Sequence, residues 1–208
     1  MNPVNIDKAI QYVKDNSKTS FDASIELHIN LDLDSNQSVR FSANLPHGTG
    51  KTKRVAVMAS KKIENADIQL DEQDLVKIEK GDLKPKIDFD VFVAEPQYMA
   101  KIAKVARVLG PAGMMPNPKT GTVSDDVTKV VNEVKKGKVE VRTEPNAPIV
   151  HTVIGKRSFD NKKLVENYEE IMSLLRQNRP AKAKPEWIKT CFVNATMGPS
   201  AQVLLEGL

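Results

Sequence analysis

The sequence contains a single cysteine, Cys191, among 208 residues. One thiol excludes an intrachain disulfide and any zinc site made of several cysteines, and it indicates a reducing compartment. Long hydrophobic runs are also missing, because lysine or proline interrupts every apolar stretch well before the roughly twenty residues that a membrane span needs. The N-terminal segment lacks the apolar region of a signal peptide. With 40% hydrophobic and 28% charged residues, the chain is predicted to be an intracellular globular protein without a membrane segment.

Signals for catalysis are equally scarce. The three histidines, His28, His47 and His151, have neither metal-ligand spacing nor a nucleophile motif beside them. Residues 48–52 read Gly-Thr-Gly-Lys-Thr and resemble the end of a phosphate-binding loop. However, Leu45 stands where that motif needs its first glycine, and the apolar run that follows predicts a strand instead of a helix. We predict no enzyme activity, no metal and no cofactor, and keep as the alternative a nucleotide-binding hydrolase that uses the loop of residues 48–52.

Hydrophobic periodicity predicts a similar mixture of elements at the two ends of the chain. A period near 3.6 over residues 6–13 predicts a short amphipathic helix. Strict alternation over residues 25–33 and again over 39–45 predicts two strands that form an antiparallel hairpin. Towards the C-terminus, the pattern predicts half-buried strands at residues 149–154 and 188–196, with a helix between them.

Before residue 63, an apolar run at residues 55–59 predicts a strand that is buried on both faces. The middle of the chain, from about residue 63 to residue 149, has a different pattern: a helical stretch near residues 71–79, a short apolar strand at residues 91–93, helical periodicity near residues 97–109 and 125–136, and a strand at residues 139–143. Alternating strands and helices are typical of a layered α/β arrangement with parallel pairing.

These patterns predict a two-domain α+β protein. A discontinuous α+β domain of residues 1–62 and 150–208 would be interrupted by an inserted α/β (Rossmann-like) three-layer domain of residues 63–149. The terminal segments together hold 18 Lys and Arg against 12 Asp and Glu, a net charge of +6, and the middle holds 13 against 15, a net charge of −2. Such asymmetry is expected when one domain binds nucleic acid, although a merely solvated basic surface gives the same count.

Two segments combine glycine and proline in unusual density. Residues 110–122 hold three of each, which fixes a rigid loop with a structural or a recognition role. Residues 196–200 end the last predicted strand with a hydroxyl, a flexible apolar side chain and a glycine that permits close backbone approach. Such groups can reach the 2′-hydroxyls of RNA, whereas a plain turn would look the same. Phe21 either stacks on a base or packs in the core.

A family resemblance rests on these segments. Residues 108–122, Val-Leu-Gly-Pro-Ala-Gly-Met-Met-Pro-Asn-Pro-Lys-Thr-Gly-Thr, closely resemble the signature loop of the family of the first protein of the large ribosomal subunit, from the mobile stalk beside the tRNA exit site. Residues 45–51, 155–159 and 196–200 resemble the same family's motifs in the same order. The resemblance covers nearly the whole chain, and the Asn-Pro-Lys form of the loop resembles bacterial members.

The resemblance implies a split two-domain fold and a non-catalytic role as a structural constituent of the large ribosomal subunit in the cytoplasm. The implied partners are large-subunit (23S) rRNA at the mobile stalk, deacylated tRNA whose release from the exit site the protein assists, and the mRNA of its own operon, whose translation it represses. The free protein is expected to be a monomer.

By position, the resemblance also implies which residues bind. The implied rRNA contacts are Phe21, Ser24, Glu26, Gly155, Lys156, Ser158, Thr196, Met197 and Gly198. The loop residues Gly110, Pro111, Gly113, Pro116, Asn117 and Lys119 would face tRNA or hold the loop. Glu26 fits only as an acceptor for a 2′-hydroxyl or a base amino group, since a carboxylate repels phosphate. Ser20 departs from the pattern, because a lysine is common there, and the chain begins close to its first helix where members commonly carry a basic leader.

Overall fold

The computed structural model describes residues 2–34, 37–145 and 147–205, apart from the side chain of Lys119. The chain divides into two units, one formed by Met1–Lys51 with Gly137–Leu208 and the other by Thr52–Lys136. We call them the terminal unit and the insert. Their boundaries differ from the expected 62/63 and 149/150, because strand β3 (Val55–Met58) pairs within the insert and strand β6 (Lys138–Arg142) pairs within the terminal unit.

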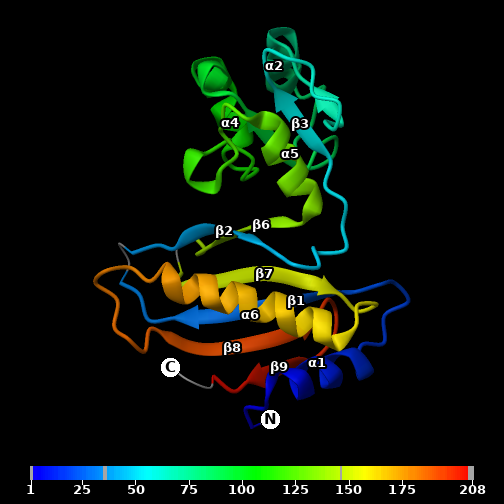
Figure 1. Ribbon diagram of the computed structural model, residues 1–208, viewed down its shortest axis with the longest axis vertical. Coiled ribbons are helices and arrows are strands. Elements are labelled where there is room, and N and C mark those ends of the chain that lie inside the picture. The colour runs from blue at the N-terminus through cyan, green and yellow to red at the C-terminus, as the bar shows by residue number, and fades with distance from the viewer. Residues whose placement is uncertain (1, 35–36, 146, 206–208) are drawn as a thin grey trace. The chain divides into compact units, whose positions relative to one another are not determined.

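The terminal unit contains a four-stranded antiparallel sheet in the order β7-β1-β8-β9 (Figure 1). Its strands are β7 (Ile149–Lys156), β1 (Ser24–Leu31), β8 (Ile188–Ala195) and β9 (Ser200–Val203). The first three match predicted strands, whereas no strand was predicted at the position of β9. The predicted hairpin is wrong: β1 pairs with β7 and β8, and β2 (Arg40–Asn44) pairs instead with β6. Alternation predicts that a segment is a strand, but it leaves the partner open.

Two helices, α1 (Ile6–Asp15) and α6 (Asn161–Gln177), pack on one face of this sheet (Figure 1). The amide of Asp7 donates to the side chain of Asn5, which caps α1. The helices bury the inward side chains of β1 at Ile25, Leu27 and Ile29, which are all fully buried. Cys191 belongs to the same core, and burial raises the pKa of its thiol to about 12. Cys191 therefore packs as a small hydrophobic residue in this core.

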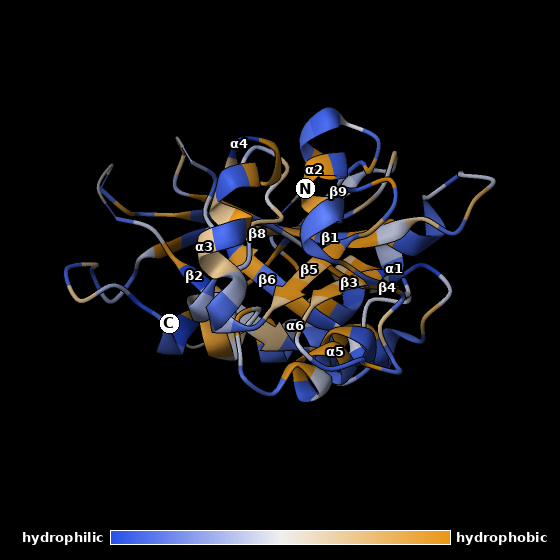
Figure 2. Ribbon diagram, turned by 90° about the horizontal axis from the view of Figure 1, so that it is seen from above, coloured by the Kyte–Doolittle hydropathy of each residue, from blue (hydrophilic) through white to orange (hydrophobic). Residues whose placement is uncertain are grey.

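The insert is built on a parallel sheet in the order β4-β3-β5, with β4 at Ile68–Gln69 and β5 at Val91–Ala94. Alternate side chains of β3 enter two separate hydrophobic clusters, one with α2 (Glu72–Lys80) and residues 102–114, the other with α5 (Val127–Lys136). The sheet therefore has helices on both faces, which explains why β3 is buried throughout. Figure 2 shows β3 and β5 as hydrophobic strands between helices with mixed surfaces. The predicted parallel pairing and layering are confirmed within the insert.

The helix predicted over residues 97–109 is broken into short turns. It consists of η1 (Pro96–Tyr98), α3 (Met99–Ile102), η2 (Ala103–Val105) and α4 (Ala106–Leu109), followed later by η3 (Pro118–Thr120). The 3-10 turns shorten the period towards three residues, and they bring Val105 into the core beside Ile102 and Leu109. Ala106, where regular helical spacing from Ile102 would place a core residue, is only half-buried for the same reason.

The loop of residues 46–51 is tied to helix α6 by Asn167, which is fully buried. The Nδ2 of Asn167 donates to the carbonyls of Gly48 at 2.9 Å and Ile154 at 2.7 Å, and its Oδ1 accepts from the amide of His47 at 3.2 Å. Strand β3 follows this loop, whereas a phosphate-binding loop leads directly into a helix whose N-terminus faces the phosphates. The predicted alternative of a nucleotide hydrolase has no structural basis at this loop.

Candidate nucleic-acid interface

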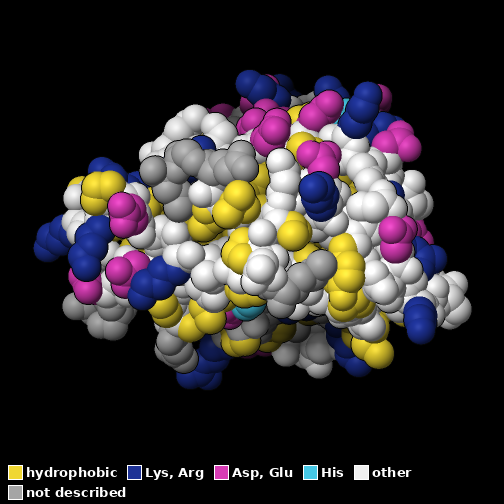
Figure 3. Space-filling model, turned by 90° about the horizontal axis from the view of Figure 1, so that it is seen from below, with side chains coloured by type: hydrophobic (Ala, Val, Ile, Leu, Met, Phe, Trp, Pro, Cys, Tyr) yellow, Lys and Arg dark blue, Asp and Glu magenta, His cyan; other side chains and the backbone are white. Residues whose placement is uncertain are grey.

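The net charge is shared evenly between the two units. The terminal unit holds 16 Lys and Arg against 14 Asp and Glu, and the insert holds 15 against 13, so each carries +2. The expected contrast of +6 and −2 is wrong, because the segment around β3 takes Lys53, Arg54, Lys61 and Lys62 into the insert. In Figure 3, basic and acidic side chains are interspersed around exposed hydrophobic ones. Net charge therefore does not identify a nucleic-acid-binding unit. A candidate site has to be found from the local arrangement of side chains.

The face of the four-stranded sheet opposite the helices carries mostly polar side chains. Burial alternates along β1, β8 and β9, so every second side chain points away from the core. We call this the open face, formed by Ser24, Glu26, His28 and Asn30 of β1, His151 and Val153 of β7, Thr190, Phe192 and Asn194 of β8, and Ser200 and Gln202 of β9.

At one end of the open face, three expected contact residues come together from distant parts of the sequence. Ser24 lies opposite Lys156, whose Nζ donates to the Ser24 hydroxyl at 3.0 Å. The backbone carbonyl of Ser24 accepts from the amide of Thr196 at 2.9 Å. A lysine, two hydroxyls and a backbone turn therefore lie side by side where β1, β7 and β8 meet.

Glu26 is held in place beside this group. Its Oε1 accepts a hydrogen bond of 2.8 Å from the Thr196 hydroxyl, and its other oxygen lies 3.9 Å from Nε2 of His28. The Glu26 side chain is 30% exposed, so the carboxylate still reaches solvent. A fixed, accessible carboxylate is an acceptor for hydroxyl and amino groups, and it disfavours phosphate at that point.

The turn after β8 exposes Met197 more than any other large hydrophobic residue described, at 87%. Its φ of 63° lies in the left-handed region that side chains with a Cβ rarely adopt. The amide of Gly198 closes the turn by donating to the carbonyl of Ala195 at 2.7 Å. Left-handed backbone at an exposed apolar side chain is typical of a functional position, because folding alone would favour glycine there.

Phe21 and Ser158 lie on the approach to β1. Phe21 is 50% exposed, which leaves its ring available for stacking. Ser158 donates from both its amide and its hydroxyl to the carboxylate of Asp22, at 3.0 and 2.8 Å. The sequence reasoning missed Asp22, and the only signal was its place directly after Phe21. It also missed Arg157, which donates to the carbonyl of Ser17 at 2.8 Å and so fixes the segment before Phe21.

Gly155 differs from the other expected contact residues because it is buried. A Cβ at this position would lie 2.7 Å from Cδ2 of Leu164 and 2.9 Å from Cδ2 of Phe159. This crowding on the helix-covered side fits a packing role, in which Gly155 allows α6 to approach the bulge in β7.

The open face also contains a pair of histidines that the sequence did not connect. His28 and His151 are opposite each other, with their Nδ1 atoms 2.7 Å apart and their rings at 66°. One Nδ1 must carry a proton and the other must accept it, so this hydrogen bond is lost when both rings are charged. Burial and the charge of His151 lower the pKa of His28 from 6.5, while Glu26 partly opposes them.

This lowered pKa predicts acid sensitivity of the terminal unit. Below pH 6.5 the unfolded chain binds more protons at His28 than the folded chain, so stability is fully present above pH 6.5 and falls as the pH drops through the folded-state pKa. Urea titrations at pH 7.5, 6.5 and 5.5, followed by fluorescence of the buried Trp187, should give a free energy of unfolding that becomes smaller as the pH is lowered. The variant His28→Gln should flatten this dependence, and an equally steep dependence in that variant would contradict the assignment.

In the insert, the loop after α4 is fixed by its own hydrogen bonds. The amide of Asn117 donates to the Thr122 hydroxyl at 2.8 Å, and the Asn117 carbonyl accepts from the amides of Thr120 and Thr122. Gly113 has a φ of 71° and its amide donates to the carbonyl of Gly110. These hydrogen bonds hold the loop together from within, as a rigid loop requires. Pro116 is buried, whereas Gly110 and Pro111 are exposed, and the Lys119 side chain lies outside the described residues.

Two basic side chains of the insert are engaged by acidic ones. Lys101 pairs with Glu72 and lies 5.4 Å from the centre of the Tyr98 ring. Arg54 has its Nε 3.4 Å from a carboxylate oxygen of Asp90. These contacts favour a structural role for both side chains.

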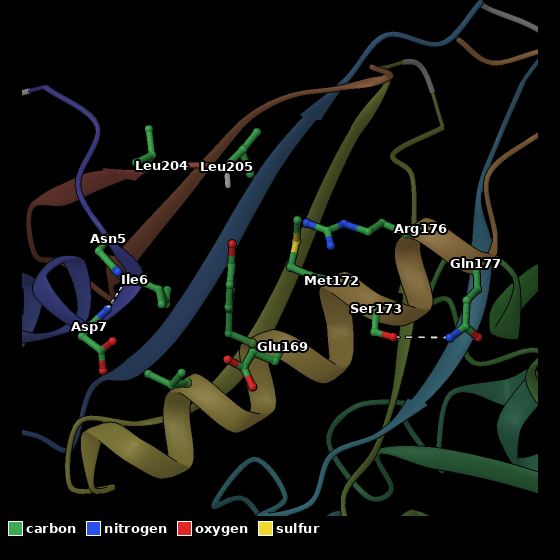
Figure 4. Close-up of a pocket in the computed structure, with 12 residues that line it drawn as sticks. Asn5, Ile6, Asp7, Glu169, Met172, Ser173, Arg176, Gln177, Leu204 and Leu205 are labelled. Carbon is green, nitrogen blue, oxygen red and sulfur yellow. Dashed lines mark hydrogen bonds between the residues drawn. The ribbon is translucent and has the colours of Figure 1, made fainter. Parts of the chain in front are cut away.

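A cavity of about 570 Å³ lies on the helix-covered side of the terminal unit (Figure 4). The start of α1, the outer side of α6 and Leu204 with Leu205 form its walls. Its ionisable lining residues, Asp7, Glu169 and Arg176, come from two helices and face different parts of the cavity. Among the described residues, no cluster of three or more His, Cys, Asp or Glu side chains could hold a metal ion. The helices described are also too short or too polar for a membrane span.

Together, these features define a two-unit α+β protein with a polar sheet face on one unit and a rigid glycine- and proline-rich loop on the other. The chain belongs to the family described as the ribosomal protein L1p/L10e family, which matches residues 13–199. The predicted family is thereby confirmed.

Several bacterial relatives are similar over nearly their whole length. The chain is 45% identical over 207 residues to the large ribosomal subunit protein uL1 of Macrococcus caseolyticus, covering 95% of this chain and 87% of the relative. It is 43% identical over 205 residues to uL1 of Rhodococcus erythropolis, with 94% and 84% covered. For uL1 of Mesoplasma florum the identity is 41% over 206 residues, with 95% and 89% covered.

Family membership gives the chain a structural role in the ribosome and no enzymatic one. The predicted location on cytoplasmic ribosomes agrees with it. The hydrolase alternative is accordingly set aside.

Proposed function

We propose that the terminal unit binds large-subunit rRNA at one end of its open face. The contact residues would be Phe21, Ser24, Glu26, Lys156, Ser158, Thr196, Met197 and Gly198, with Gly155 supporting them from below. The observation that supports this proposal is the hydrogen-bonded group of Thr196, Glu26 and Ser24, which joins two strands beside the exposed Met197.

The chemistry of this group suits folded RNA better than a simple polyanion. Glu26 can accept from a 2′-hydroxyl or a base amino group, whereas Lys156 can approach a phosphate. The backbone of Gly198 and the thioether of Met197 can contact a sugar or a base face. Since only one strong cation belongs to the group, recognition rests on shape and hydrogen bonds more than on charge.

The variant Thr196→Val tests this proposal, because it keeps the branched shape and removes the hydroxyl that fixes Glu26. We expect a 10- to 100-fold loss of affinity for a stalk rRNA fragment, about 1–3 kcal/mol. Fluorescence anisotropy at several salt concentrations measures it. The matched control is Thr128→Val on the exposed side of α5, which should bind like the unchanged protein. Equal affinities for Thr196→Val and the control would refute the site.

We further propose that the same surface binds the protein's own operon mRNA, and that the rigid loop of the insert takes part in the release of deacylated tRNA. If one surface serves both RNAs, a leader fragment of that mRNA must compete with the stalk rRNA fragment, and Thr196→Val must weaken both. Simultaneous binding of the two fragments would contradict a shared site. The loop residues Gly110, Pro111, Gly113, Pro116, Asn117 and Lys119 stay proposed contacts or supports.

A further inference from the structure

A row of ring-bearing side chains crosses the open face next to the proposed rRNA site. His28 lies opposite His151 on β7 and opposite Phe192 on β8, and Phe192 in turn lies opposite Gln202 on β9. Directly opposed residues of antiparallel strands have neighbouring side chains. We call His151, His28 and Phe192 the ring row.

The ring row faces solvent. Along β8 the core takes Cys191 and Val193, so Phe192 points the other way and remains partly exposed. His151 is exposed, and the His28 side chain is 29% exposed. Three ring-bearing side chains therefore lie next to one another on an accessible part of the sheet. Packing of the core does not require rings there, because this face points away from the core.

The rings are also held in place before any ligand arrives. The hydrogen bond between the Nδ1 atoms of His28 and His151 sets the two rings nearly edge to face, with centres 4.9 Å apart. Glu26 lies 3.9 Å from the opposite side of the His28 ring. A platform that is already ordered loses little entropy when a partner binds.

The position of the ring row points to the same RNA as its ligand. Glu26 and His28 are two residues apart on β1 and point to the same face, so their Cα atoms are only about 7 Å apart. Glu26 belongs to the proposed site and contacts both Thr196 and His28, so the two surfaces are continuous. Unpaired bases commonly stack on aromatic and histidine side chains displayed by a sheet.

We propose that the ring row stacks an unpaired base of the bound rRNA and so extends the recognition surface across the sheet. This inference rests on the proposed function, because it assumes that the RNA reaches the open face at Thr196. It assigns Phe192 and the two histidines as additional contacts.

The first test is the full chain carrying Phe192→Leu, which keeps an apolar side chain and removes the stacking ring. We expect about a tenfold loss of affinity for the stalk rRNA fragment. This lies in the lower part of the range of losses seen when an aromatic side chain that stacks on one base is removed. Phe192→Tyr should bind like the unchanged protein, and equal thermal unfolding of all three proteins shows that the fold is kept.

A second measurement reports stacking directly. Trp187 is the only tryptophan of the chain and is 2% exposed, so RNA should change its fluorescence little. The variant Phe192→Trp places an indole in the ring row, and we expect its fluorescence to be quenched when the fragment binds. Binding without quenching would overturn the proposal.

The outcomes separate this inference from the proposed function. If Thr196→Val weakens binding and Phe192→Leu does not, the ring row is refuted and the rRNA site stands. If the unchanged protein has no preference for the stalk fragment over random RNA, both fail. If Phe192→Leu leaves RNA affinity unchanged but alters the molar mass in light scattering, the ring row joins copies of the chain and the proposal is overturned.

Discussion

Replacing Asn167 by aspartate should destabilise the terminal unit by about 4 kcal/mol at pH 7. The amide of Asn167 donates to two carbonyls, those of Gly48 and Ile154, within 2.9 Å, and its side chain is fully buried. A carboxylate at this position has no N–H to donate, so the carbonyls of Gly48 and Ile154 lose their hydrogen bonds from residue 167. Each orphaned buried acceptor costs about 1–3 kcal/mol, and burying the charge adds to this cost. Urea unfolding followed by Trp187 fluorescence measures the loss.

The matched control is Asn161→Asp at the start of the same helix. Its Oδ1 already accepts from Nζ of Lys14 at 2.8 Å, and a negative charge is favourable in the first turn of a helix. Its Nδ2 donates to Oε1 of Gln11 at 2.7 Å, but this bond is exposed, so water can take the place of the lost donor. We therefore expect stability within about 0.5 kcal/mol of the unchanged protein. A similar loss in both variants would mean that any acidic substitution on α6 is harmful, and that the Asn167 contacts are not the cause.

Replacing Gly137 by alanine should cost about 3 kcal/mol. Gly137 has a φ of 113°, where side chains with a Cβ are strained. A Cβ there would also lie 2.4 Å from the Cα of Gly48, and both partners are backbone, so neither can rotate away. The loop of residues 46–51 and the start of β6 would have to separate. Urea unfolding followed by far-ultraviolet circular dichroism and by Trp187 fluorescence checks the size of the loss.

Gly81→Ala separates strain from crowding. Gly81 ends α2 with a φ of 85°, but a Cβ there meets nothing within 4 Å. The left-handed backbone alone should cost about 1 kcal/mol. If Gly137→Ala proves no worse than Gly81→Ala, the close approach of Gly48 and Gly137 is not important for stability.

Much of the local structure could be predicted from the sequence. Alternation at Ile25, Leu27 and Ile29 places β1 correctly, because a half-buried strand needs one apolar face whatever its partners are. The apolar run of β3 predicts a strand buried on both faces, and the structure has one. The residues of the candidate site came from a family resemblance, and their gathering at one end of the sheet could not be derived from periodicity. Neither periodicity nor the resemblance indicated the roles of Asp22 and Arg157 or the contact between His28 and His151. These contacts depend on which strands become neighbours in the folded chain.

By itself, the sequence determined where most of the strands and the longer helices lie, and which family the chain belongs to. A helix or strand that buries one face needs apolar side chains at a regular spacing along its own segment, so the periodicity of the sequence indicates the type of element. The tertiary structure alone decided that β1 joins β7 and β8 instead of β2, and that β3 belongs to the insert. Strand pairing joins backbone groups that every residue has, so the sequence specifies the partner only through the packing of the whole core. The same packing places four basic residues in the insert, so the two units do not differ in net charge. The proposal of RNA binding therefore depends on the geometry around Thr196.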